Sequence, residues 1–284
     1  MTGKAYRVVL RLRSPLHVGR MKLGNVQRTH PYVTGRVLWG ALTERLTRDG
    51  FRGGGPATDS QLYQEMGKRV HNELAFTYLF PTIHADGKVD LWPWEDDFQS
   101  RFLSTYASTA LTYPQQSAEE GSLHEVECIA PHTLDTGDPV YLTGYVFKGD
   151  GVPDWQAALQ RLQIGGERGY GWGWVQPVED PVLWDGQSLF DWYAVERDDW
   201  PPVLTAGKDA RLLAHALAAD FDEIHKAVSG VKGPIEPLVG RETDPEDGRF
   251  GVWISQARVC YVPGSQVKSD TTFRVGPYGI WEAV

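Results

Sequence analysis

Cysteine and long apolar runs are scarce in this chain of 284 residues. Its two cysteines, Cys128 and Cys260, lie far apart, which excludes a disulfide scaffold and a cysteine-based zinc site. No run approaches the roughly 20 apolar residues of a membrane-spanning helix. Residues 1–14 alternate arginine with valine and leucine, where a signal peptide would have an apolar stretch. The hydrophobic content of 41% excludes a disordered protein, so we expect a soluble cytoplasmic protein without a membrane partner.

Motifs for metal binding and covalent catalysis are also missing. None of the eight histidines has HExxH spacing, and no serine lies in a nucleophile elbow, so we expect no metal and no cofactor. Cys128 lies among apolar neighbours and is predicted to be an inert core thiol. His17 and His30 bracket a basic segment, where an imidazole beside phosphate-binding arginines can act as a general acid or base. The alternative is that both histidines only hydrogen-bond the backbone or RNA.

The charge of the chain is unevenly distributed. The net charge is −9, yet residues 1–52 hold eleven basic residues and only two acids, Glu44 and Asp49. An acidic body with one basic segment repels phosphate everywhere except along that segment, and therefore orients a polyanion. The alternative is that the basic segment pairs with acidic loops elsewhere in the fold.

Residue periodicity predicts the order of elements along the chain. Residues 16–32 contain glycine, asparagine and proline without a regular period, and we expect a long loop there. Residues 209–228 have apolar side chains at helical spacing, which predicts an amphipathic helix. The same reasoning predicts strands over 6–13, 74–80, 89–92, 123–129, 139–148, 252–261 and 272–275, and helices over 35–47, 62–70 and 155–162.

The order strand, helix, two strands, helix, strand indicates an α+β fold. It is typical of the ferredoxin-like (RRM-like) βαββαβ core, here with insertions. We expect this core to be an RNA-binding domain over residues 1–178. Residues 179–284 then form a C-terminal extension, an amphipathic helix plus strands, that packs on the core or on neighbouring subunits.

A glycine-rich loop over residues 165–173 is the most informative local feature. Its glycines expose backbone N–H groups and allow close approach of another chain, while Arg168 adds a bidentate phosphate donor. Tyr170, Trp172 and Trp174 offer faces on which bases can stack. The spacing fits neither a Walker loop nor a dinucleotide fingerprint. The alternative is a bulged strand end whose tryptophans pack into a core.

Three segments together resemble the RAMP proteins, the RNA-binding subunits of CRISPR effector complexes. The first runs from Ser14-Pro-Leu-His-Val-Gly19 through Tyr32-Val-Thr-Gly-Arg-Val-Leu-Trp-Gly-Ala-Leu-Thr-Glu-Arg-Leu46. The second, residues 107–129 with Ser122-Leu-His-Glu-Val-Glu, is similar to a segment of type III subunits. The third, residues 164–175, resembles the RAMP glycine-rich loop. The order and spacing of the three match over residues 5–178.

The resemblance implies a subunit that holds guide RNA (crRNA) beside related RAMP subunits and the large subunit, and meets target RNA indirectly. In backbone subunits that cleave target RNA, an Asp in the loop after the first strand carries the activity, whereas residues 20–31 here contain no acid. This favours a non-catalytic subunit that grips the 5′ repeat-derived handle, of the Csm/Cmr or type III-D kind. The expected RNA contacts are His17, Arg20, Lys22, Arg28, His30, Arg36, Gly165, Gly166, Arg168, Gly169, Tyr170, Gly171, Trp172 and Gly173.

Two other functions compete with guide-RNA binding. The first is a metal-independent endoribonuclease that processes CRISPR repeats with His17 or His30 as general acid or base. The second is a protein-only scaffold or a small-molecule enzyme with an incidental basic segment.

Overall fold

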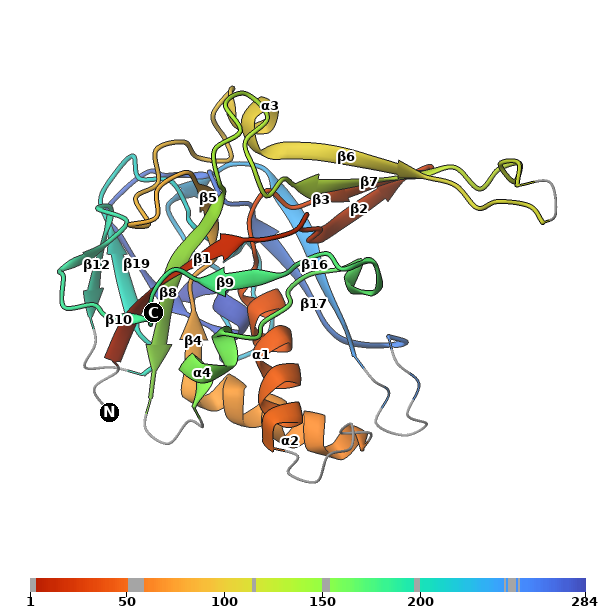
Figure 1. Cartoon of the computed structure of the whole chain (residues 1–284). Helices are drawn as coiled ribbons and strands as arrows, with labels where there is room; N and C mark the ends of the chain where they lie inside the picture. The colour runs from red at the N-terminus through yellow and green to blue at the C-terminus, as the bar shows by residue number, and fades with distance from the viewer. Residues whose placement is uncertain are drawn as a thin grey trace.

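The computed structural model describes residues 4–50, 59–113, 116–149, 154–196, 200–242, 244, 249 and 251–284. These residues form several β-sheets and a few helices, so the expected mixed α+β class is confirmed (Figure 1). Residues 53–56, whose sequence Gly-Gly-Gly-Pro predicts a flexible connector, lie outside the described residues.

The first sheet is antiparallel and centres on β1 (Lys4–Leu12) and β8 (Tyr141–Lys148), which pair along almost their full length. On the other edge of β1 lie β9 (Val175–Pro177) and β10 (Val182–Leu183). On the other edge of β8 lie β4 (Leu74–Phe76) and β5 (Phe80–Thr82). The strand order is therefore β9, β1, β8, β4.

Helices cover one face of this sheet. They are α1 (Gly35–Gly50), α2 (Ser60–Glu73) and α4 (Trp155–Leu159) (Figure 1). The alternation of β1 directs Val8, Leu10 and Leu12 to this side, where they are buried with Leu38 and Leu42 of α1. This core fixes the N-terminal end of α1 beside the segment that follows β1.

The opposite face of the first sheet is covered by the C-terminal third of the chain. Leu204, Phe273 and Trp281 from this third are buried in one cluster with Tyr145 and Phe147 of β8. Its eight-stranded sheet has the order β11 (Ser188–Leu189), β12 (Tyr193–Glu196), β13 (Val203–Ala206), β19 (Thr271–Val275), β20 (Trp281–Ala283), β14 (Ala216–Leu217), β17 (Trp253–Tyr261) and β16 (Ile235–Glu242). A small pair, β15 (Val231–Lys232) and β18 (Gln266–Val267), and the 3-10 turn η2 (Pro277–Gly279) complete it.

A four-stranded sheet projects from the body. Its order is β2 (Gly19–Leu23), β3 (Val26–Thr29), β7 (His124–Ile129) and β6 (Leu103–Ser108), with α3 (Phe98–Phe102) at the base of β6. The segment between β6 and β7 extends farther from the body than any other part of the drawn chain (Figure 1). The 3-10 turn η1 (Arg168–Tyr170) lies in the glycine-rich loop.

The structure corrects three sequence predictions of local structure. Residues 16–32 form the β2–β3 hairpin where a loop was expected, because β3 gains a parallel pairing with β7 from far along the chain. Residues 89–92 are irregular, and the strand of this region is β5. Residues 209–228 contain no helix but only the two-residue strand β14. Here Ala216 pairs with Tyr261 on one side and Trp281 on the other, so tertiary pairing overrides helical spacing.

Candidate nucleic-acid interface

A pocket of about 220 Å³ lies between the segment after β1, the N-terminal turns of α1 and the glycine-rich loop. We call it the α1 pocket. Among its lining residues are five predicted RNA contacts: His17, Arg36, Gly165, Gly166 and Arg168. The glycine-rich loop thus meets two segments that lie more than a hundred residues before it in the chain.

Backbone hydrogen bonds fix the glycine-rich loop on the segment after β1. The amide of Gly166 donates to the carbonyl of His17 at 2.8 Å, and that of Gly173 to Pro15 at 2.8 Å. At Gly165, where φ is +79°, a Cβ would lie 2.4 Å from the same His17 oxygen. A larger residue does not fit there, so glycine is required by the close approach of two chain segments.

His17 presents its imidazole to the pocket. Its Nδ1 donates to the carbonyl oxygen of Glu127 on β7 at 2.7 Å, which fixes the ring and directs Nε2 toward the opposite side. A Cβ on Gly19 would lie 3.5 Å from that Nε2. The ring is therefore held by a strand of the projecting sheet.

Arg36 is held in place by three neighbours. Its guanidinium lies 4.8 Å from the ring centre of Tyr278 and 5.7 Å from that of Trp39. It also forms an ion pair with Glu242 at 2.9 Å. The two aromatic rings restrict the Arg36 side chain at the N-terminal end of α1. This reduces the conformational entropy that the side chain would lose on binding an anion.

Four of the predicted cations have carboxylate partners. The pairs are Arg20 with Glu236 at 3.1 Å, Arg28 with Glu127 at 3.0 Å, Arg36 with Glu242 at 2.9 Å, and Arg168 with Glu44. Intramolecular pairing, the alternative considered for the basic segment, therefore occurs. By contrast, the exposed side chain of Lys22 on β2 has no ion-pair partner within the parts of the chain that the structure describes.

The aromatic side chains of the glycine-rich loop differ in exposure. Tyr170 is 81% exposed and Trp174 is also exposed. Trp172 is only 8% exposed, packs with Val126 and Cys128, and meets the ring of Tyr106 edge-on at 5.9 Å. Trp172 therefore packs into a core, which is the alternative considered above, whereas the ring of Tyr170 is accessible. Cys128 is buried, and burial raises the pKa of its thiol to about 11.

His30 lies outside the α1 pocket. It is 6% exposed, its ring is stacked on Tyr32 at 5.3 Å, and its buried Nδ1 has no hydrogen-bond partner. Burial, reinforced by the nearby imidazole of His215, lowers the pKa of His30 to about 3. The imidazole is therefore neutral near pH 7 and is a poor general acid there.

A buried chain of hydrogen bonds that the sequence analysis missed leads from Arg20 into the interior. The Oε1 of Glu236 accepts from Nε2 of His215 at 2.7 Å, and Nδ1 of His215 accepts from the hydroxyl of Tyr78 at 2.8 Å. Burial opposes ionisation of Glu236, but the hydrogen bond from His215 and the charge of Arg20 together outweigh it and lower its pKa to about 2. Glu236 and His215 come from the C-terminal third, and no local motif marked them.

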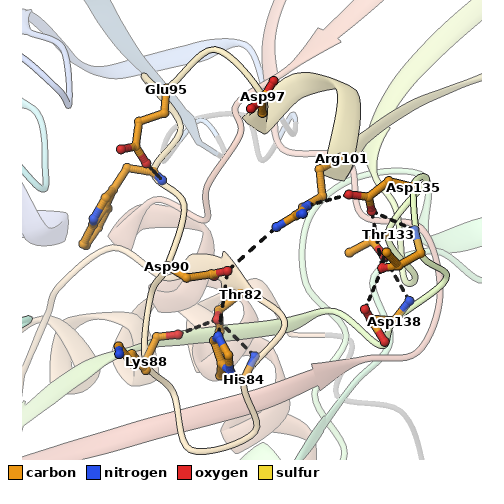
Figure 2. Close-up of polar contacts among 12 residues, drawn as sticks. Thr82, His84, Lys88, Asp90, Glu95, Asp97, Arg101, Thr133, Asp135 and Asp138 are labelled. Carbon is orange, nitrogen blue, oxygen red and sulfur yellow. Dashed lines mark hydrogen bonds and ion pairs between the residues drawn. The ribbon is translucent and has the colours of Figure 1, made fainter.

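A second polar network joins the base of the projecting sheet to its neighbouring loops. Arg101 of α3 donates to Asp135 at 2.8 Å and lies 3.8 Å from Asp90, so one guanidinium connects three segments (Figure 2). The Arg101 side chain lowers the pKa of Asp135. Around Asp135, the hydroxyl of Thr136 donates to Asp138 at 2.6 Å. This network is structural, because its arginine charge is already shared between two carboxylates.

Neither a metal centre nor a membrane span was found in the described part of the chain. Its histidines, cysteines and acids form no group of three or more that could hold a metal ion. None of its helices is both long and apolar enough to cross a bilayer.

Comparisons with known proteins reveal a similarity of fold. A chain of the cryo-EM structure of the Type III-B Cmr-beta bound to cognate target RNA and AMPPnP, state 1, is 14% identical. The similarity covers 92% of this chain and 86% of that chain, with a TM-score of 0.52. A chain of the Cmr-beta structure bound to cognate target RNA is 13% identical over the same shares, with a TM-score of 0.49. No family model and no curated protein matches this sequence. The chain therefore has a fold similar to that of a chain in the Type III-B Cmr-beta assembly.

Proposed function

We propose that this chain is a guide-RNA-binding subunit of a type III CRISPR ribonucleoprotein complex. The observation that carries the proposal is the α1 pocket, in which His17, Arg36 and Arg168 meet the backbone of the glycine-rich loop. The fold similarity to a chain of the Cmr-beta assembly supports the same assignment. On this proposal the chain's partners are crRNA, related RAMP subunits and the large subunit, with target RNA contacted through the guide.

The chemistry of the α1 pocket suits a phosphate of an RNA backbone. The sixteen-residue helix α1 has no acidic residue in its first turn, so its positive dipole end is not neutralised from within the helix. Arg36 and Arg168 add planar donors that match phosphate oxygens. Open space at Gly169 lets a sugar-phosphate chain approach the backbone.

The ion pairs around the pocket are compatible with RNA binding. Solvent-accessible pairs contribute only about 0–1 kcal/mol, so a phosphate can replace Glu242 on Arg36 or Glu44 on Arg168 at little cost. Until then, the carboxylates neutralise the arginines and weaken contacts with other anions. We infer that RNA binding proceeds by exchange of a carboxylate for a phosphate.

We further propose that residues 1–178 form a ferredoxin-like (RRM-like) domain and residues 179–284 its extension. The strand order β9, β1, β8, β4 is the 4-1-3-2 order that this topology produces from strand, helix, two strands, helix, strand. The absence of an acid in residues 20–31 favours the handle-gripping role over target cleavage.

The endoribonuclease alternative now depends on His17 alone. His17 lies in the α1 pocket beside two arginines, where an imidazole has the neighbours that phosphodiester cleavage needs. His30 is poorly suited because it lies outside the α1 pocket and its pKa is about 3. Incubation of repeat RNA with the protein in EDTA separates the two functions, since cleavage that His17→Ala abolishes supports the nuclease.

The deciding experiment is to tag the chain in its native host and sequence the RNA that co-purifies. Short RNAs that share one repeat-derived 5′ end, together with several related proteins, are expected. Protein alone, or random RNA that dissociates at moderate salt, would refute the proposal.

Charge removal tests the pocket itself. Arg36→Ala with Arg168→Ala is expected to weaken RNA binding by about 10- to 100-fold and to reduce the salt slope by about 0.7 for each lost phosphate contact. Glu242→Gln releases Arg36 and is expected to tighten binding. Lys232→Ala, an exposed charge of β15 far from these residues in sequence, is the control. Equal affinities for the double variant and the control would place the RNA elsewhere.

A further inference from the structure

A second pocket lies on the face of the first sheet opposite α1. It has a volume of about 240 Å³, and we call it the sheet-face pocket. Its floor includes Arg7 of β1 and Tyr145 of β8, which are direct cross-strand partners in the register of the sheet. The wall comes from Trp92 and from Trp184 and Phe190 of the C-terminal third. The C-terminal third thus leaves one hollow over the two central strands.

The aromatic wall is rigid before any ligand binds. The ring of Tyr145 meets Phe190 edge-on at 5.0 Å and Trp184 at 5.5 Å. Trp92 meets Phe190 at 5.7 Å and stacks with Trp94 at 5.2 Å and with Trp192 at 4.9 Å, and the last two rings are 6.3 Å apart. Rings fixed on several sides lose little entropy when a planar group stacks against them.

The rim of the sheet-face pocket carries cations that differ from those near α1 in their ion pairing. Arg7 and Lys88 line it, and neither has a carboxylate within ion-pair distance among the residues that the structure describes. Asp86 and Asp191 also lie on the rim, and the carboxylate of Asp86 accepts from the amide of Lys88 at 3.0 Å. The hydroxyl-bearing Ser188 completes the polar edge. The pocket therefore combines aromatic faces, unpaired cations and hydrogen-bond acceptors.

We propose that the sheet-face pocket binds a single nucleotide. A base stacks on the aromatic wall, its phosphate binds Arg7 and Lys88, and Asp86 or Asp191 accepts hydrogen bonds from base or ribose donors. The pocket is smaller than the roughly 300–1,000 Å³ of drug-sized sites, which suits one base and excludes a folded segment. An aliphatic ligand would leave the charged rim unsatisfied.

This inference is independent of the proposed guide-RNA site. The α1 pocket lies on the helical side of the first sheet, and the sheet-face pocket lies on the other side. The nucleotide can be free in solution or can be the end of an RNA strand, because both present the same base and phosphate.

The test uses the full chain and titrates AMP, GMP, CMP and UMP while tryptophan fluorescence is recorded. Saturable quenching is expected, because a base would stack beside Trp184. Arg7→Gln and Lys88→Gln are each expected to raise Kd about tenfold, whereas Lys232→Gln leaves it unchanged. Circular dichroism of each variant checks that the fold is retained.

Two comparisons make the test decisive. The pocket is assigned to an RNA end if a 5′-phosphorylated RNA trinucleotide displaces AMP and if Arg7→Gln weakens the binding of that trinucleotide. Mononucleotide binding that the trinucleotide does not displace assigns it to a free nucleotide. No saturable quenching at millimolar nucleotide overturns the proposal. It is also overturned if Arg36→Gln abolishes nucleotide binding and Arg7→Gln does not, since the ligand would then occupy the α1 pocket.

Discussion

His30 shows how burial changes the chemistry of a single side chain. The sequence places it at the end of a basic segment, which makes it a candidate for catalysis. In the structure its ring lies against Tyr32 and meets His215 edge-on at 5.8 Å. Because its buried Nδ1 has no hydrogen-bond partner among the described residues, the nearby carboxylate of Glu236 compensates a positive charge on the ring only in part. His30 thus acts as a neutral packing residue near pH 7.

This environment predicts a pH dependence of stability. The pKa of His30 is lowered from 6.5 to about 3 in the folded protein, so the unfolded chain takes up a proton first as the pH falls. The free energy of unfolding is therefore expected to decrease below about pH 6.5, by up to about 1.4 kcal/mol per pH unit from this group. His215 acts in the same direction, because burial also lowers its pKa.

Urea unfolding between about pH 6.5 and pH 5 measures this slope, above the range where carboxylates dominate. His30→Gln is expected to flatten it by up to about 1.4 kcal/mol per pH unit, whatever the variant does to stability at neutral pH. A slope identical to that of the parent protein would show that His30 is protonated in the folded state.

The residues of the α1 pocket could be predicted in part from the sequence. His17, Arg36 and Arg168 lie at the ends of predicted elements, where side chains from different segments converge. Their partners Glu242 and Tyr278 lie more than two hundred residues after Arg36, and no periodicity connects them with it. Glu44 was visible as one of only two acids in residues 1–52, and it pairs with Arg168. The sequence thus indicated the candidate cations, but the carboxylates that pair with them could be identified only from the tertiary structure.

At the scale of elements, the segment between β6 and β7 carries exposed aromatic surface away from the body. In this segment, which extends away from the body (Figure 1), Tyr113 is 94% exposed. A ring exposed to this extent contributes almost nothing to folding, but it can stack on a base and contribute about 1–3 kcal/mol to RNA affinity.

Tyr113→Ala is therefore expected to weaken binding of single-stranded RNA about tenfold without changing Tm. Filter binding and a thermal melt of the same sample measure the two quantities. Leu134→Ala, an exposed apolar residue of another loop, is the matched control and is expected to change neither. A loss of Tm in the Tyr113 variant would mean that the ring packs on the protein.

Elements that follow from the spacing of neighbouring residues were predicted more successfully than elements that depend on pairing with distant segments. The helix α1 and the strands β1 and β8 follow from residue spacing, and the structure contains them within a few residues of the expected bounds. The predicted helix over residues 209–228 is wrong because Ala216 and Leu217 pair as extended chain with β17 and β20. Helical spacing in a short apolar segment does not distinguish a helix from buried extended chain.

At the scale of the whole molecule, the two parts of the chain share one of the two large cores. The cluster behind the first sheet contains Ala5, Tyr145 and Phe147 from the first part and Phe273 and Trp281 from the second. Charges of the two parts also pair with each other, since Arg20 and Arg36 of the basic segment form ion pairs with Glu236 and Glu242. Folding of the first part is thus coupled to the second by both apolar packing and ion pairs.

This coupling predicts the effect of a single change in the second part. Trp281 is 1% exposed and packs against Tyr193 at 4.8 Å and Phe273 at 5.1 Å between ring centres. Trp281→Ala is expected to lower the free energy of unfolding by about 3–5 kcal/mol, because it removes a buried ring and leaves a cavity. Tyr170→Ala, which removes an exposed ring, is expected to change it by less than about 0.5 kcal/mol.

Two probes show whether the parts unfold together. Every α-helix in the described residues lies before residue 178, so helical circular dichroism reports on the first part. Hydrogen exchange of β13 and β19 amides reports on the second. Trp281 lies in the core that the two parts share, so its loss removes contacts from both. The stabilities reported by the two probes are therefore expected to fall by the same amount in the Trp281 variant. If instead the helical signal kept its original midpoint while the β13–β19 amides lost protection, the first part would be an independent folding unit, and the shared core would not couple the two.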